Sequence, residues 1–229
     1  MIAKANIDKI FLSRILLNSG IRVSLISRIL DMGVSSIISW SKNFGIYKTS
    51  SDIFSRGMFI EPKGIYQYRF KSLTCYVFYL IFCKVENYLR ENFSTKDENL
   101  TSLSFAIAMK LFNQKYRDKI FFFSSEKDQN KQVSPSNFWR AVMFFQKGLI
   151  LIKKCPSGHV GPENYEGKAH CSCWHSCRNI SYWEKFQETI SQIIEEINSE
   201  ENFTDSEIKK ALNELILENS FFFLSIKPA

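Results

Sequence analysis

The sequence is poor in glycine and proline and in long apolar runs. It holds nine glycines and five prolines among 229 residues, which argues against a β-rich, turn-dense fold and for helices. The most apolar stretch, SLTCYVFYLIFC at 72–83, has twelve residues, whereas a helix needs roughly 20 to cross a bilayer. We expect no secretory signal at the N-terminus, because Asp8, Lys9 and Arg14 interrupt its apolar residues. We therefore expect a cytoplasmic protein without a membrane partner.

Histidine is scarcer still, and it is confined to one segment. All three histidines and four of the six cysteines lie between Cys155 and Cys177. Cytoplasmic thiols stay reduced, so clustered cysteines there indicate a metal rather than disulfides. The other two cysteines, Cys75 and Cys83, lie in the apolar stretch and are expected to be small core residues.

Apolar residues, by contrast, are plentiful and arranged with helical spacing. With 45% hydrophobic and 15% aromatic residues, the chain can bury a substantial core. We expect a mainly α fold, a helical bundle that carries an N-terminal helix–turn–helix-like unit and a small zinc-binding loop module. The expected division is a helical body at 1–148, a Cys/His module at 149–178 and an acidic helical extension at 179–229. Helices are predicted at 4–18, at about 67–91, at roughly 100–115, at 134–148, and twice within the extension. Gly20 is expected to end the first helix, and the helix at 134–148 opens with an N-cap signal at Ser134 followed by a proline and closes on Gly148.

Residues 22–44, RVSLISRIL–DMGV–SSIISWSKNF, read as two short helices joined by a tight turn. We expect Gly33 to supply a positive φ in the turn, and Ser35 or Ser36 to cap the second helix. In DNA-binding versions of this motif the second helix enters the major groove. The residues expected to contact DNA are Arg22 and Arg28 at phosphates, with Ser35, Ser36, Ser39, Lys42 and Asn43 on the second helix. A plain three-helix packing unit is the alternative.

Charge is unevenly distributed along the chain. Residues 1–50 hold seven basic and two acidic groups, whereas residues 178–229 hold five basic and ten acidic groups. A basic body with an acidic tail favours a nucleic-acid partner over an acidic substrate. A solvated basic surface without a partner is the alternative.

The Cys/His segment offers enough soft ligands for a closed tetrahedral zinc site, which usually takes two ligand pairs on tight turns. Its first half carries Cys155 and His159, and its second half carries three further cysteines. The expected ligands of one structural Zn²⁺ are Cys155, Cys173 and Cys177, with Cys171 or His159 as the fourth. His170 and His175 leave other sets of four open.

A catalytic zinc would keep an open coordination position, often beside a general base such as Glu. Glu163 and Glu166 lie within the segment, but nothing in the sequence places them at the metal. A Cys–His nucleophile pair is a further possibility, and four thiols in one stretch argue against it. We therefore expect a protein that is not an enzyme.

Three stretches, in this order, carry a resemblance to one known family: LLNSGIRVSLISRILDMGVSSIISWSKNF, RGMFIEPKGIYQYRF and FWRAVMFFQKGLILIKKC. They resemble segments of the FlhC family, a subunit of the bacterial flagellar master transcriptional activator, over about residues 7–177. The family has two CxxC pairs, whereas here Gly158 stands at the second position of the first pair and CSCWHSC replaces the second pair. Only Cys155 carries over directly, and the segment from 178 to 229 is longer than the family's tail.

The resemblance implies a zinc-stabilised, mainly helical DNA-binding subunit. Such a subunit acts in a hetero-oligomer with an FlhD-type partner, binds double-stranded promoter DNA and recruits RNA polymerase. Its targets would be flagellar genes or transfer genes of mobile elements. The alternative function is a zinc-stabilised helical protein-interaction module that does not bind DNA.

Overall fold

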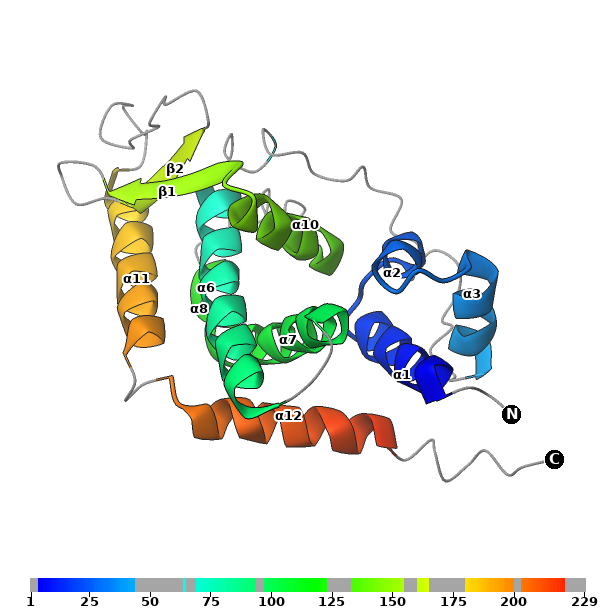
Figure 1. Cartoon of the computed structure of the whole chain (residues 1–229). Helices are drawn as coiled ribbons and strands as arrows, with labels where there is room; N and C mark the ends of the chain where they lie inside the picture. Colours follow the sequence, from blue (N-terminus) through cyan, green and yellow to red (C-terminus); the bar gives the residue numbers. More distant parts are fainter. Residues whose placement is uncertain are drawn as a thin grey trace. The chain divides into compact units, whose positions relative to one another are not determined.

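The computed structural model describes residues 4–43, 64, 69–93, 97–122, 133–154, 160–164, 180–199 and 203–220. These residues are mainly helical, which confirms the predicted fold class at that level (Figure 1). They form two compact units. The first holds α1, α2, α3, the end of α6 from Val85, α7 to Lys110, and α12; the second holds the start of α6 and the residues from Leu111 to Thr204.

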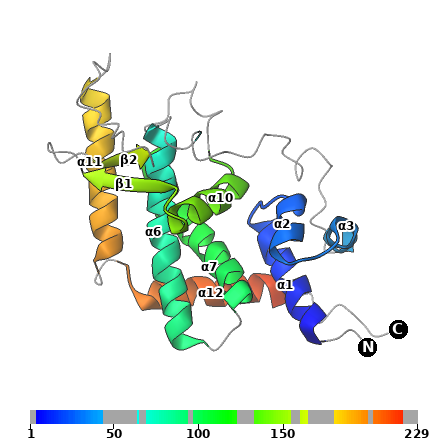
Figure 2. The ribbon, with the colours of Figure 1, turned by 45° about the horizontal axis from the view of Figure 1, so that its top comes forward.

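The first unit contains three short N-terminal helices, which we call the three-helix unit: α1 at Lys4–Asn18, α2 at Val23–Ile29 and α3 at Val34–Asn43. Their core is aliphatic, because each helix turns β-branched or leucine side chains inward. Both views place α1 between the α2–α3 pair and α12, at Asp205–Ser220 (Figures 1 and 2). The fully buried members of this core include Ile15, Leu16, Ile21, Ile26 and Ile37.

Two of the three helices end in the same backbone motif. After α1, Gly20 adopts φ 79°, its N–H donates to the Leu17 carbonyl, and the N–H of Ile21 donates to Leu16. After α2, Asp31 takes the equivalent position with φ 47°. The prediction that Gly33 supplies the positive φ is therefore wrong. Aspartate tolerates this conformation better than most residues with a side chain, so Gly33 is not needed for it.

The rest of the first unit comes from α6 at Arg69–Asn92, α7 at Asp97–Leu111 and α12. Lys110 links α7 to α12, because its Nζ lies 3.1 Å from Glu214 Oε2 and also donates to Glu218. Buried Asn219 of α12 accepts a hydrogen bond from the Asn18 side chain of α1 at 3.1 Å. The C-terminal helix thereby joins the N-terminal helices in one unit.

The second unit is built around aromatic rings. The cluster of Phe78, Phe112 and Phe138, which we call the aromatic cluster, joins α6, η1 and α10. Phe78 and Phe138 stack with ring centroids 4.6 Å apart, and both meet Phe112 edge-on. Helix α10 spans Pro135–Gln146; Ser134 caps it by accepting the Asn137 N–H, and Gly148 ends it with φ 67°. Both signals were predicted.

The helix predicted at 100–115 is longer than expected and irregular. A π-turn, η1 at Phe112–Tyr116, follows α7 and continues into α8 at Arg117–Phe121. Phe112, Tyr116 and Ile120 all point inward, so the irregularity keeps the apolar side buried across the change of pitch. Tyr116 donates to Glu196 of α11, and Lys119 Nζ lies 3.3 Å from the same carboxylate.

The β-hairpin was not expected from the sequence. Strands β1 at Ile150–Lys154 and β2 at Val160–Asn164 pair antiparallel, with Ile150 opposite Asn164 and Lys154 opposite Val160. The hairpin lies at the N-terminal half of α11, Ile180–Asn198 (Figure 1). Buried Gln187 of α11 bonds both backbone groups of Val160, donating to its carbonyl at 3.1 Å and accepting from its N–H at 3.3 Å.

Of the helices that the structure describes, none by itself has the length and apolarity to span a bilayer. Taken together by length and composition alone, α2 and α3 meet that criterion as a sharply bent pair.

Candidate nucleic-acid interface

Helices α2 and α3 form a sharply bent pair. Their axes differ in direction by 119°, and four residues, 30–33, connect them. The connection is fixed by two hydrogen bonds: the Met32 N–H donates to the Ser27 carbonyl at 2.9 Å, and the Ser27 hydroxyl donates to the Met32 carbonyl. In a helix–turn–helix motif, the two helices lie at about 90–120° to each other and are joined by a turn of three or four residues. The angle and the turn length both lie within that range.

Helix α3 begins earlier than predicted. The carbonyl of Gly33 accepts the N–H of Ser36 at 3.1 Å and of Ile37 at 3.2 Å, so the helix starts at Val34. The prediction that Ser35 or Ser36 caps the helix is therefore wrong. Glycine is an accepted residue at a cap position, and here it takes that place. As a consequence, both serines lie in the first turn with exposed side chains.

The exposed side of α3 carries hydroxyl groups and a lysine. Ser35, Ser39 and Lys42 follow one another at helical spacing, with Ser36 beside them, and all four are exposed. Within the described part of the chain, no hydrogen bond involves the hydroxyls of Ser35, Ser36 or Ser39. The inward serine behaves differently: Ser41 is buried, and its hydroxyl donates to the Ile38 carbonyl at 2.8 Å. The outer hydroxyls thus remain available to a ligand.

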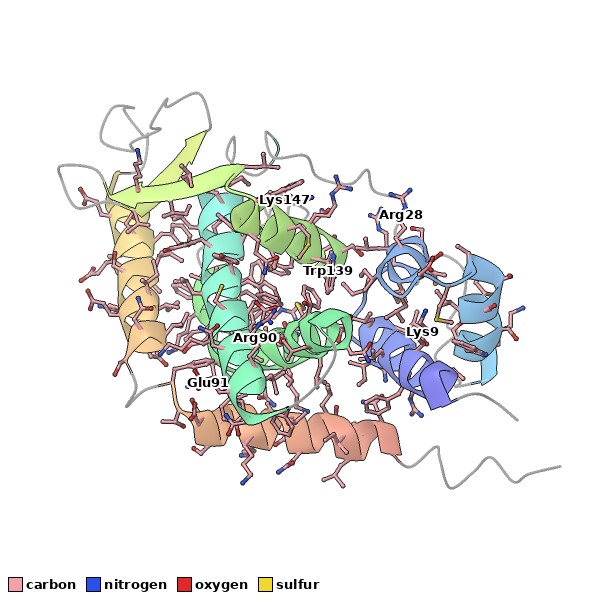
Figure 3. All side chains as sticks on the ribbon, in the orientation of Figure 1. Lys9, Arg28, Arg90, Glu91, Trp139 and Lys147 are labelled. Carbon is pink, nitrogen blue, oxygen red and sulfur yellow. The ribbon has the colours of Figure 1, made fainter. Side chains whose placement is uncertain are left out.

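The two predicted phosphate-binding arginines differ in their surroundings. Arg28 is exposed on α2 (Figure 3). Arg22 precedes α2 and is half-buried, and this burial lowers the pKa of its guanidinium from the ordinary value. Arg28 is therefore the better placed of the two for a solvent-side phosphate. Asn43 is the last residue of α3.

The charge of the three-helix unit suits a polyanion. Its residues 4–43 include six basic and two acidic residues, and α3 itself has no carboxylate. One of the two acids, Asp31, is exposed in the turn directly before α3. Like charges repel, so among the side chains described from 9 to 42 Asp31 is the one acidic group, and its carboxylate would repel a polyanion at this turn.

The candidate zinc ligands Cys155, His159, Cys171, Cys173 and Cys177 all lie outside the described residues. The structure describes residues that lie near these candidate ligands in the chain: the two hairpin strands and helix α11. The paired residues Lys154 and Val160 are the chain neighbours of Cys155 and His159, and they stand opposite each other in the hairpin. Helix α11, which begins three residues after Cys177, is bonded to Val160 through Gln187.

One exposed residue of α3 was not among the predicted contacts. Val34 is 43% exposed at the first position of the helix. A valine in a turn next to a helix is ordinarily expected to be buried. The apolar pattern of the sequence therefore gave no reason to include Val34 among the expected DNA contacts. The signal that would have revealed it is Gly33 as the cap, because that choice moves Val34 into the first turn.

Comparison of this chain with family models, with curated proteins and with solved structures finds no match.

Proposed function

We propose that this chain is the DNA-binding subunit of a transcriptional activator, with α3 in the major groove and Arg28 at the phosphates. The observation that carries the proposal is the 119° pair of α2 and α3, whose outer helix presents Ser35, Ser36, Ser39 and Lys42 without a carboxylate. The proposed targets are promoters of flagellar genes or of transfer genes on mobile elements. The proposed partners are an FlhD-type subunit and RNA polymerase, as the resemblance implies.

Phosphate neutralisation makes DNA binding salt-dependent, with a slope of about one unit of log K per log salt for each contact. The test measures binding of the purified chain, alone and with an FlhD-type partner, to a fluorescent random-sequence 20-bp duplex across a salt series. The double variant Arg28→Gln/Lys42→Gln should lower the slope by about two units. Asp31→Asn keeps a residue that tolerates the turn conformation and should tighten binding.

The matched control is Lys209→Gln/Lys210→Gln, which removes the same charge from two exposed positions of α12. If α3 is the interface, this control keeps the wild-type slope. Equal slopes in both double variants, or binding that does not respond to salt, would exclude α3 as the DNA-contacting element.

The second part of the proposal is one structural zinc in segment 155–177, with Cys155, Cys173 and Cys177 as ligands and Cys171 or His159 as the fourth. The hairpin supports this, because the pairing of Lys154 with Val160 brings together the two ends of the segment that carries Cys155 and His159. The metal is assigned a folding role and no reaction. Structural zinc couples metal binding to folding.

The metal is tested by elemental analysis of the purified chain. Cys155→Ser should lose the bound zinc, and a chelator should make the residues around the hairpin more sensitive to protease. Cys83→Ser is the control, because Cys83 is a partly buried thiol of α6 outside the segment. Full zinc occupancy in Cys155→Ser would remove this cysteine from the site.

The alternative is a helical protein-interaction module that does not bind DNA. One observation favours it: α12 exposes two large apolar side chains, Ile216 at 42% and Leu217 at 59%. Neighbouring apolar groups on a surface are typical of a contact with another protein. Zinc content without DNA binding, with or without the partner, would favour this function, and Ile216→Asp/Leu217→Asp would then abolish partner capture.

A further inference from the structure

Val34 differs from every other outward-facing residue of the three-helix unit. Among the side chains described from 9 to 42, it is the one large hydrophobic that is exposed. A single exposed apolar residue is common on protein surfaces and needs no explanation. Its neighbours make this one informative, because Ser35 and Ser36 stand beside it in the first turn of α3.

Side chains differ in which bases they can distinguish. Arginine and lysine select guanine, asparagine and glutamine select adenine, and an apolar group selects the 5-methyl of thymine, whereas serine bonds to either kind of base. Ser35, Ser36 and Ser39 therefore bind base edges with little discrimination. In the first turn of α3, only Val34 carries chemistry that distinguishes one base from the others.

The backbone fixes the position of this methyl-bearing group. The Gly33 carbonyl accepts hydrogen bonds from the backbone N–H groups of Ser36 and Ile37. The Ile37 side chain is fully buried in the core of the three-helix unit. That anchor sets the rotation of the first turn, so Val34 stays at the edge of the exposed face that Ser35, Ser39 and Lys42 occupy. Valine is stiff about χ1, and little freedom is lost when it makes a contact.

We propose that Val34 is a specificity-determining residue that contacts the 5-methyl group of a thymine in the DNA site. The inference rests on the proposed function and adds the base that the first turn of α3 reads. A buried methyl group contributes about as much as a CH₂, which corresponds to about fourfold in affinity.

The test combines a protein change with a matching DNA change. Wild-type chain is used to select a binding sequence from random 20-bp duplexes, and each thymine of that sequence is then replaced singly by deoxyuracil, which lacks the methyl. At one position the replacement should weaken wild-type binding about fourfold. Val34→Ala should weaken binding to the thymine duplex by a similar factor and should no longer respond to deoxyuracil at that position.

The control variant is Ile216→Ala, which shortens an apolar side chain of nearly the same exposure on α12 and should keep the wild-type response to deoxyuracil. Because Val34 is exposed, Val34→Ala should fold as the wild type does, and circular dichroism checks this. If the chain binds DNA but the effects of Val34→Ala and deoxyuracil add at every position, the inference is wrong and the proposed function stands. If no duplex binds, with or without the partner, both are wrong.

Discussion

The core of the three-helix unit is aliphatic, whereas the core between α6, η1 and α10 is aromatic. Ile15, Ile26 and Ile37 fill the first, and the rings of Phe78, Phe112 and Phe138 fill the second. Helix length differs as well: α2 has seven residues and α3 has ten, whereas α6 has 24.

The difference bears on how each region is stabilised. An isolated helix shorter than about 12 residues is marginal in water, so α2 and α3 depend on packing for their existence. Each ring of the aromatic cluster buries roughly 150–250 Å², which concentrates stability in three residues. The surface that we propose for DNA is therefore held by many small contacts, and the aromatic cluster by a few large ones.

The largest expected effect comes from the aromatic cluster. Phe78→Ala removes a fully buried ring that stacks on Phe138 and meets Phe112, and should lower the free energy of unfolding by about 3–5 kcal/mol. Urea denaturation measures this loss. Phe122→Ala is the control, because Phe122 is 81% exposed and its removal should change stability by no more than about 0.5 kcal/mol. Similar losses in both variants would mean that stability is not concentrated in the cluster.

The second largest effect is expected in the aliphatic core of the three-helix unit. Ile26→Ala opens a cavity at a fully buried position of α2 and should lower the free energy of unfolding by about 2–4 kcal/mol. Since α2 has little stability of its own, hydrogen exchange in α2 and α3 should accelerate more than in α10. The control Ser24→Ala changes an exposed residue of the same helix and should leave exchange rates unchanged. Equal acceleration in α10 would mean that the two cores unfold together.

Local signals were predictable from the sequence, and long-range ones were not. The stops at Gly20 and Gly148 and the Ser134 cap were found because each depends on a few neighbouring residues. Cys75 was expected in the core; it is fully buried, and burial raises the pKa of its thiol. The hairpin was missed because ILIKK is too short an apolar run to distinguish a strand from a helix, and its pairing partner VGPEN carries no strand pattern.

For the candidate site, helical spacing was enough to place Ser35, Ser39 and Lys42 on one exposed face. Helical spacing was not enough to find the start of α3. The helix begins at Val34, earlier than predicted, and the side chain of Val34 is exposed. The same limit applies to Ile216, which follows buried Leu212 and Leu215 on the same helix but is 42% exposed. A periodic pattern fixes which residues share a face, but the edge of that face is set by what packs against it.

A smaller effect is expected at the contact between α11 and the hairpin, which the polar side chain of Gln187 makes. Gln187→Ala removes both hydrogen bonds to Val160 and leaves its backbone N–H and carbonyl without this partner, at a cost of about 1–3 kcal/mol. The amides of β1 and β2 should then exchange faster while those of α10 keep their protection. Gln192→Ala, at an exposed position of the same helix, is the control. Unchanged exchange in the hairpin would mean that strand pairing alone holds it.

The smallest effect belongs to the ion pairs between α7 and α12 in the first unit. Lys110→Met should lower the free energy of unfolding by about 0.5–1 kcal/mol at neutral pH. Burial of Lys110 acts to lower its pKa, but its hydrogen bonds to Glu218 and Glu214 outweigh that, so the pKa is raised above 10.5. A raised pKa means that the contribution is complete at neutral pH and is lost as the pH rises through the folded value.

The wild type and Lys110→Met should therefore converge in stability as the pH rises above 10.5, a course that urea denaturation at several pH values follows. Lys147→Met, at an exposed position after α10, should differ little from the wild type at any of these pH values. A constant gap between wild type and Lys110→Met up to the highest pH would mean that the charge of Lys110 does not cause the loss, because a contribution from the charge disappears as the lysine deprotonates.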